Sequence, residues 1–397
     1  MNDSSAAASL CEARGRTPRH HRSRAARPPS RGFGAARRAA ATGIALLALS
    51  AAGANWKIGE PGWLYEFPRD HHPHAEFKTE WWYFTGNVFD AEGRQFGYEL
   101  TFFRHGIKPR AARDPKSSRF IVDDLKFAHF AVTDVSGKSF RFEQKMSRGA
   151  FGEAGFDDGK RLAWIDNWML TLNADNSFDI TATGKPGAMR LHLRPTKTPV
   201  AHGENGISLK AAGAGHASHY YSIPRLETTG EFLVDATAHA VRGESWFDHE
   251  WATTQLGPEQ IGWNWLSVQF GDGSELMLYQ MRLKNGQVDP VSSGTFVAAD
   301  GATKFLPSSA FAMMPGRHWK SKASGGDYPI EWRVEIPEQQ ISFTVKPVLD
   351  DQELALNQLT YWEGAIEVAG QRAGRPLSGR GYLELTGYAS GAQSLGR

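Results

Sequence analysis

The fold is decided by two neighbouring segments, Glu80-Trp-Trp-Tyr-Phe-Thr-Gly-Asn-Val88 and Gln95-Phe-Gly-Tyr-Glu-Leu-Thr-Phe-Phe-Arg104. Both are rich in the aromatic and β-branched residues that are enriched in strands, and a short turn with Gly93 separates them. Together they predict an antiparallel hairpin. The same pattern recurs along the chain and predicts further strands at 125–133, 139–146, 162–172, 177–183, 189–193, 231–234, 239–246, 263–270, 275–283, 330–336, 340–345, 360–368 and 381–388.

Helical periodicity is nearly absent. No window keeps a 3.6-residue repeat for more than about two turns, and residues 351–358 are the best candidate for a short helix. Regularly spaced strands with almost no helix are typical of an all-β barrel or sandwich. A weak internal repeat favours two such units, because the hairpin that starts at Trp81 is echoed by one that runs from Trp263 to Arg282.

A break at 253–258 separates the two repeats. We therefore expect three parts: an export signal at 1–54, a first β domain at 55–254 and a second β domain at 255–397. Each β domain is long enough for an eight-stranded closed sheet, whose interior holds side chains or one small ligand. One large sandwich is the alternative.

The N-terminal segment has the features of an export signal. Its basic residues are all arginines, an uncharged run follows at 39–50, and Ala52-Gly-Ala54 has the small-x-small form of a cleavage site. We expect cleavage near Ala54 and a mature protein that is periplasmic or secreted, in contact with the membrane only during export. An uncleaved anchor is the alternative, although the run is shorter than the roughly 20 residues that span a bilayer.

The charge balance excludes several classes of partner. The chain has 45 basic and 43 acidic residues, but without the arginine-rich N-terminal segment the net charge is −5. A nucleic-acid partner requires a cationic face and is not expected. The only cysteine, Cys11, lies in the N-terminal segment, so the rest of the chain has no thiol chemistry. Glycine motifs that bind phosphate or dinucleotides are absent from the sequence, and we expect no cofactor.

The densest group of reactive side chains is Asp248-His-Glu250, which lies in the segment 243–251. Strand alternation sends Trp246, Asp248 and Glu250 to one face and Phe247, His249 and Trp251 to the other. Burial would lower the pKa of the histidine and raise that of a carboxyl, so these groups are candidates for acid or base. Alternatively, His249 bonds a loop carbonyl and the carboxylates pair with an arginine.

A second group lies at 216–225, where Tyr220, Tyr221, Ser222 and Arg225 supply hydrogen-bond donors that could orient an oxygenated substrate. An aromatic plug in which Arg225 pairs with an acid is the alternative. Ser222 lacks the glycine setting of a hydrolase nucleophile.

Two further groups contain histidines or buried charges. His71, His72 and His74 with Glu76 have the residue types of a metal site but not a scaffold that aims them at one ion, so we expect solvated surface histidines and no metal. Glu80 and the pair at 104–105 lie within apolar strands. They could line a pocket or form an internal ion pair.

Four motifs in order give the chain a family resemblance. They are 74–86, Tyr220-Tyr-Ser-Ile-Pro-Arg225, Trp246-Phe-Asp-His-Glu-Trp251, and Tyr361-Trp-Glu-Gly-Ala365 with Gly381-Tyr-Leu-Glu-Leu-Thr-Gly387. The chain resembles the AttH and carotenoid 1,2-hydratase (CrtC-like) family of predicted secreted hydrolases. This resemblance implies two lipocalin-like antiparallel β-barrel domains with an apolar pocket, and an association of many bacterial members with ABC export systems.

The resemblance also implies a chemistry, the acid-catalysed hydration of an alkene. It places the family's His-x-Trp pair on His249 and Trp251, and its Tyr-x-Asp pair on Tyr279-Gln-Met281, where Met281 replaces the acid. Asp248 or Glu250 would then supply the proton.

We therefore expect an apolar, lipid-like or isoprenoid-like ligand that undergoes hydration or hydrolysis; the alternative is a non-catalytic carrier or an accessory of an ABC transporter. The candidate catalytic residues are Asp248, His249 and Glu250. The candidate binding residues are Trp251, Tyr220, Tyr221, Ser222, Arg225, Tyr279, Glu80 and Trp82.

Overall fold

The structure is a computed structural model that describes residues 55–114, 116–118, 120–356 and 359–389. The expected export signal at 1–54 lies outside the described residues. No helix among them is both long enough and apolar enough to cross a bilayer. The described residues form one compact unit.

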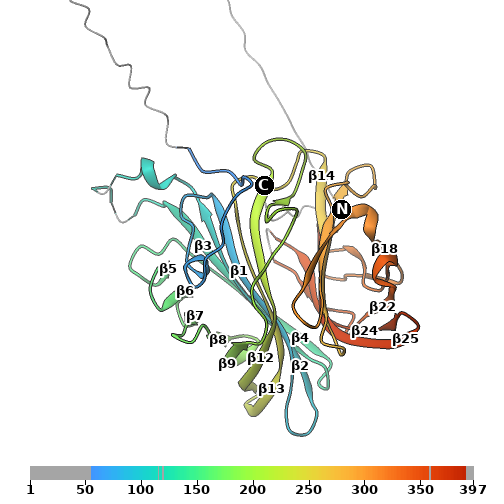
Figure 1. The fold of residues 1–397 in the computed structure, drawn as a ribbon. Coiled ribbons are helices and arrows are strands. Elements are labelled where there is room, and N and C mark those ends of the chain that lie inside the picture. Colours follow the sequence, from blue (N-terminus) through green and yellow to red (C-terminus); the bar gives the residue numbers. More distant parts are fainter. Residues whose placement is uncertain (1–54, 115, 119, 357–358, 390–397) are drawn as a thin grey trace, which may run out of the picture. The chain divides into compact units, whose positions relative to one another are not determined.

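The first half of the described chain forms a single antiparallel sheet of thirteen strands that curls into a nearly closed barrel (Figure 1). Its strands follow the order β4-β3-β2-β1-β13-β12-β9-β8-β7-β6-β5, and β10 and β11 pair with β12. Their bounds are β1 Thr79–Phe89, β2 Gln95–Gly106, β3 Asp124–Asp134, β4 Ser139–Ser147, β5 Ala154–Phe156, β6 Arg161–Ile165, β7 Trp168–Leu172, β8 Phe178–Gly184, β9 Gly187–Pro195, β10 Val200–Ala201, β11 Ser208–Leu209, β12 Ala217–Val234 and β13 Thr237–Ala252.

The second half forms a ten-stranded antiparallel sheet in the order β17-β16-β15-β14-β25-β24-β22-β21-β18, with β23 paired to β24, and a separate β19-β20 ribbon. The bounds are β14 Gln260–Phe270, β15 Glu275–Leu283, β16 Ser293–Val297, β17 Thr303–Pro307, β18 Ala312–Pro315, β19 His318–Lys320, β20 Asp327–Pro329, β21 Trp332–Ile336, β22 Ile341–Pro347, β23 Glu353–Leu354, β24 Tyr361–Arg372 and β25 Arg375–Thr386. The expected all-β fold with two lipocalin-like barrels is confirmed.

Both sheets are built on the same plan. In each, the first hairpin (β1-β2 or β14-β15) pairs with the last strand of its own half (β13 or β25), so the repeat seen in the sequence is a repeat of topology. The connection between the sheets runs from β13, which ends at Ala252, to β14, which begins at Gln260. The division expected at 254/255 falls within this connection.

Two expected elements differ in the structure, and several strands that we did not expect are present, among them β5, β16 and β17. The helix expected at 351–358 is wrong, because its described residues are irregular apart from the short strand β23. The strand expected at 162–172 is a hairpin, β6-β7, which turns at Asp166 with a positive φ of 51°. The segment 217–225, which we did not expect to be a strand, is the first half of the long strand β12.

Each barrel has its own apolar core, and the outer face of the first sheet contacts the second sheet. Strand alternation points Trp82, Phe84 and Phe247 into the first core. The intervening residues of β1 point outward, and there Tyr83 donates a hydrogen bond to Glu363 of β24 (2.7 Å). The Gln269 side chain bonds the Ser245 carbonyl in the same way (2.9 Å). The two sheets therefore meet over buried polar contacts.

Candidate functional site

The two sheets enclose a cavity of about 490 Å3, within the range of sites for small molecules. The first sheet contributes outward-facing residues of β1, β2, β3, β4, β12 and β13, and the second contributes residues of β14, β15, β24 and β25. The lining combines aromatic rings with acidic side chains: Trp81, Tyr83, Phe103, Phe127, Tyr220, Trp263, Trp265, Tyr279 and Tyr361 with Glu99, Asp248, Glu250, Glu363 and Glu384.

Asp248 is the cavity acid that accepts three hydrogen bonds from side chains of the first sheet. Its Oδ2 accepts a hydrogen bond from the Tyr220 hydroxyl (2.6 Å), and its Oδ1 accepts bonds from Trp246 Nε1 (2.5 Å) and from Ser222. Burial nevertheless raises the pKa of Asp248 to about 7, although the three hydrogen bonds act to lower it. At neutral pH the group can therefore both take up and release a proton. Ser222 also lies 2.5 Å from Nε2 of His202.

Three glutamates lie close to one another in the cavity wall. Glu363 and Glu384 are direct partners in the β24-β25 ladder, and Glu99 comes from β2 of the other sheet. Burial raises the pKa of all three carboxyls, and their mutual repulsion raises those of Glu363 and Glu384 further, to about 8 for Glu384. At neutral pH Glu363 and Glu384 hold protons, whereas Glu99, with a pKa of about 7, is about half protonated.

Few polar groups satisfy these carboxyls. Glu384 accepts a hydrogen bond from Trp263 Nε1 (3.0 Å), and Glu363 Oε1 accepts the bond from Tyr83. Oε2 of Glu99 and Oε2 of Glu363 are buried without a hydrogen-bond partner in the structure. A protonated carboxyl that is free on one side can donate to a bound molecule.

Glu250 differs from the other acids because it forms an ion pair. Its Oε1 lies 3.0 Å from Nζ of Lys210 and accepts a bond from Gln255 (3.1 Å). Burial opposes the charge of Lys210, but the neighbouring Glu250 charge outweighs it and raises the lysine pKa. The lysine ammonium also lies 4.9 and 4.4 Å from the ring centroids of Tyr220 and Tyr279. Glu250 is therefore an ion-paired part of the cavity wall.

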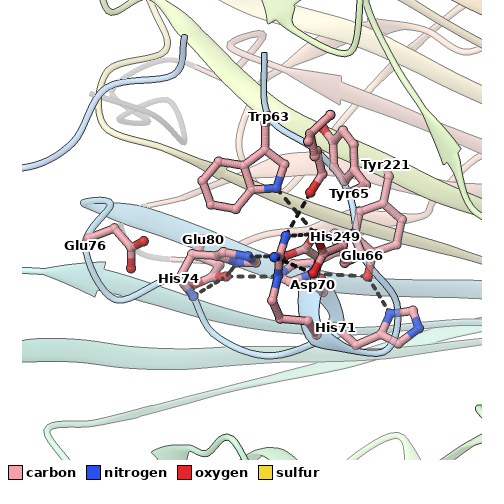
Figure 2. Close-up of polar contacts among 12 residues, drawn as sticks. Trp63, Tyr65, Glu66, Asp70, His71, His74, Glu76, Glu80, Tyr221 and His249 are labelled. Atoms are coloured by element: carbon pink, nitrogen blue, oxygen red, sulfur yellow. Dashed lines mark hydrogen bonds and ion pairs between the residues drawn. The ribbon is translucent and has the colours of Figure 1, made fainter. Parts of the chain in front are cut away.

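The opposite face of β13 points into the first barrel and contributes to a separate network (Figure 2). His249 Nε2 lies 3.0 Å from Glu80 Oε1, and its Nδ1 lies 2.9 Å from the Asp70 carbonyl. His74 bridges the two acids, with Nδ1 2.8 Å from Glu80 and Nε2 3.3 Å from Asp70. Arg104 completes the charge balance at 3.2 Å from Glu80.

The charges of this network support one another. Although burial favours the neutral carboxyls, bonds from His74, His249 and Arg69 hold the pKa values of Glu80 and Asp70 well below their usual range. The same carboxylates raise the pKa of His74 against its burial. Burial lowers the pKa of His249, although its hydrogen bond to Glu80 opposes this shift.

Within the described residues, His74, Glu80 and His249 have the atom types and proximity of a metal site. An ion would have to replace their hydrogen bonds and lie beside the Arg104 guanidinium. The arrangement fits a proton-sharing network better than a divalent cation.

The structure divides the expected site residues into three groups. Asp248, Glu250, Tyr220 and Tyr279 line the cavity. The inner side of the first barrel holds Glu80, Trp82, Tyr221, His249 and Trp251. His249 therefore does not face the cavity that its sequence neighbours Asp248 and Glu250 line. Ser222 and Arg225 are not part of the lining: Ser222 lies behind Asp248, and Arg225 forms ion pairs with Glu275 (2.7 Å) and Glu244 (2.5 Å).

The expectation of solvated histidines was wrong for two of the three. His71 and His74 are buried because the segment before β1 packs on the first core, where the His71 ring bonds Tyr221 (2.7 Å). Of the two arrangements left open for Glu80 and Arg104, the internal ion pair is the one present.

Sequence reasoning missed the acids Glu99, Glu363 and Glu384. Glu363 and Glu384 lie within motifs that already marked the family resemblance, and strand alternation places each among aromatic neighbours. That signal could have identified them as candidates. Met281 does line the cavity, but the acids around it come from other strands.

The comparisons with known proteins agree with one another. A family model described as AttH-like matches residues 59–388. The crystal structure of an AttH protein from Nitrosomonas europaea is 32% identical, with a TM-score of 0.75 over 84% of this chain and 100% of that chain. Kievitone hydratase from Nectria haematococca shares the fold, with a TM-score of 0.66 at 14% identity, over 85% of this chain and 97% of that chain. "Dehydratase asqC" of Emericella nidulans is 22% identical over 274 residues, which are 64% of this chain and 75% of the relative.

Proposed function

We propose, from the premise that this chain belongs to the AttH-like family, that it adds water to, or removes water from, an apolar small molecule in the cavity between the two sheets. The observation that carries the proposal is the set of carboxyls with raised pKa values in an aromatic cavity. Two relatives whose names state hydratase or dehydratase chemistry support the same reaction type.

The acid in this proposal is the Glu363–Glu384 pair. Each carboxyl holds a proton at neutral pH, and loss of either proton would place a negative charge beside its cross-strand partner. Such a pair can donate one proton while the other stays in place. In hydration, the alkene π electrons form a new C–H bond with the carboxyl proton, which leaves a carboxylate and a carbocation.

The base in this proposal is Asp248. Its charge contributes to the raised pKa values of Glu363 and Glu384, so the three groups act within one electrostatic site. Asp248 removes a proton from water as the water oxygen bonds to the carbocation. The proton then returns to the Glu pair, and the net change is the addition of one water. Dehydration follows the same steps in reverse.

The aromatic lining stabilises the intermediate. Ring faces attract a carbocation as they attract other cations. Trp265 is held in position by a hydrogen bond from its Nε1 to the Tyr220 hydroxyl (3.0 Å), and Tyr83 packs against it edge-on with centroids 5.3 Å apart. These contacts keep the rings rigid around a ligand.

The direct test is incubation with an isoprenoid alkene in water labelled with 18O, followed by mass spectrometry. We expect one labelled hydroxyl in the product with the wild-type protein and none with Glu363→Gln/Glu384→Gln. Ligand that binds but is recovered unchanged from the wild type would contradict the enzymatic function and favour the carrier.

We expect a narrow pH optimum between about 7 and 8. Asp248, with a pKa of about 7, must be ionised, so kcat/KM rises with pH up to that value. Glu384, with a pKa of about 8, must be protonated, so kcat/KM falls above it. Rate profiles from pH 5 to 10 check this expectation. In Asp248→Asn the residual kcat/KM should no longer fall as the pH decreases below about 7. An acidic limb that is unchanged in this variant would show that Asp248 is not the base.

Replacing His249 with glutamine should affect stability and not chemistry. The substitution leaves part of the Glu80 network unpaired, so we expect the free energy of unfolding to fall by about 1–3 kcal/mol. Because His249 does not line the cavity, the pH profile of the reaction should keep its shape. Denaturant unfolding and rate measurements on the same preparation separate the two effects. A profile with one limb missing would place His249 in the reaction.

The cellular location is part of the proposal. An export signal cut near Ala54 would release the protein, in which the strands and the cavity all lie after residue 55, to the periplasm or the outside of the cell.

A further inference from the structure

The region around one end of β2, β3 and β4 exposes an unusual number of large apolar side chains. Of the twelve such side chains exposed in the described part of the chain, five lie here: Ile107, Phe120, Ile121, Met146 and Phe151, with exposures from 50% to 70%. We call these five residues the apolar rim. Figure 1 shows the β2-β3 connection projecting beyond the end of β3.

Two members of the apolar rim are in contact, and a backbone hydrogen bond closes the connection that carries three of them. The rings of Phe120 and Phe151 meet edge-on with centroids 5.9 Å apart. Ile107 donates its backbone hydrogen bond to the Asp123 carbonyl (2.8 Å), which brings the two ends of the β2-β3 connection together. A group of exposed apolar side chains of this kind is typical of a binding surface.

Cations surround the apolar rim. The guanidinium of Arg148 lies 5.2 Å from the Phe120 ring centroid, and Lys108, Arg110 and Lys116 follow in the β2-β3 connection. Within the described residues these four side chains form no ion pair, whereas Arg113 pairs with Asp124 (2.7 Å). The acids nearest in sequence are Asp114, Asp123, Asp124 and Glu153, and Asp124 is already paired with Arg104 and Arg113. Cations without an acidic partner beside exposed apolar side chains are notable here, because the chain after residue 54 is acidic overall.

The apolar rim borders the cavity. Met146 belongs to both, since it lines the cavity and is 53% exposed. Its neighbours His105, Leu125 and Phe127 line the cavity wall at the same ends of β2 and β3 from which the connection starts. An apolar molecule held against this surface would meet the mouth of the cavity directly.

We propose that the apolar rim and its cations dock this protein on an anionic lipid bilayer, so that the cavity takes up its ligand from the membrane. Insertion of Phe and Ile side chains supplies apolar burial, and the Lys and Arg side chains meet lipid phosphates. The docking is inferred from this surface alone. The inference that the docked protein takes up its ligand from the membrane rests on the proposed function.

Vesicle sedimentation tests the docking. The chain should begin at Asn55, because the arginines before it would themselves bind an anionic surface. The described residues, which carry both sheets, form one compact unit that begins there. We expect binding to vesicles that contain phosphatidylglycerol, weaker binding at high salt, and little binding to pure phosphatidylcholine. Phe120→Ser/Ile121→Ser should weaken binding by about tenfold or more. Leu233→Ser/Met314→Ser removes apolar side chains of 40% and 38% exposure elsewhere and should bind as the wild type does.

The outcomes separate the two proposals. The docking proposal is overturned if the wild-type protein does not bind anionic vesicles. It is also overturned if the double variant at Phe120 and Ile121 binds them as strongly as the wild type does. Activity on ligand dispersed without vesicles should be equal in the wild type and in that double variant. Vesicle binding without any such activity would overturn the proposed function and leave the docking intact.

Discussion

Glu384→Gln is expected to lower kcat/KM by a factor of about 10²–10⁴, the usual contribution of a general acid. The substitution keeps the size of the side chain and its contact with Trp263, but it removes the proton that the carboxyl holds at neutral pH. It also removes the charge that Glu384 carries once ionised, which adds to the effect of burial in raising the pKa of Glu363. We therefore expect the alkaline limb of the pH profile to move as well as the rate to fall.

Glu367→Gln is the matched control. Glu367 lies on β24, the same strand as Glu363, but its side chain is exposed and makes only a long contact with Arg380 (3.8 Å). We expect this variant to keep the wild-type rate. An equal loss in both variants would mean that general damage to the second sheet, and not the loss of an acid, lowers the rate.

Glu80→Ala is expected to reduce the free energy of unfolding by about 3–5 kcal/mol, the usual result of removing one partner of a buried ion pair. Glu80 is fully buried and accepts bonds from the His74 backbone and ring, His249 and Arg104. Without Glu80, the positive charge of Arg104 remains close to the first core but has one carboxylate partner fewer. Denaturant unfolding measures the change, and Glu76→Ala, an acid of the same segment whose side chain is 38% exposed, should cost less than about 1 kcal/mol.

The same network makes stability depend on pH. The folded-state pKa values of Glu80 and Asp70 are depressed, so their contribution is complete above the ordinary carboxyl range near pH 4 and is lost as the pH falls below it. The pKa of His74 is raised, so its contribution is complete below about pH 6.5 and is lost as the pH rises through the folded-state value. Glu80→Ala should show a shallower loss of stability in acid than the wild type.

Local patterns in the sequence were sufficient for the long hairpins and for the faces of their strands, but not for the short strands or the first half of β12. The segments around Trp81 and Trp263 predict the two hairpins that start the sheets, and alternation places Asp248 and His249 on opposite sides of β13, as the structure shows. The helix expected at 351–358 failed because a short polar and apolar pattern does not reveal that Glu353 pairs with Trp362 in a ladder.

The candidate site could be predicted only in part, because it depends on contacts between distant segments. Glu99 and Glu363 are far apart in the sequence and meet only when the outer face of one sheet packs against the other. Likewise, nothing local to the segment 71–76 shows that its histidines are buried, since their partners Glu80, Tyr221 and His249 come from β1, β12 and β13.

Infrared titration of the carboxyl C=O stretch tests most directly whether the acids between the sheets are neutral near pH 7. The account predicts a protonated-carboxyl band that persists at pH 7, disappears as the pH rises past about 8, and shrinks in Glu384→Gln. The central claim would be contradicted if every carboxyl were already ionised at pH 6 and the spectra of the wild type and of Glu384→Gln were the same.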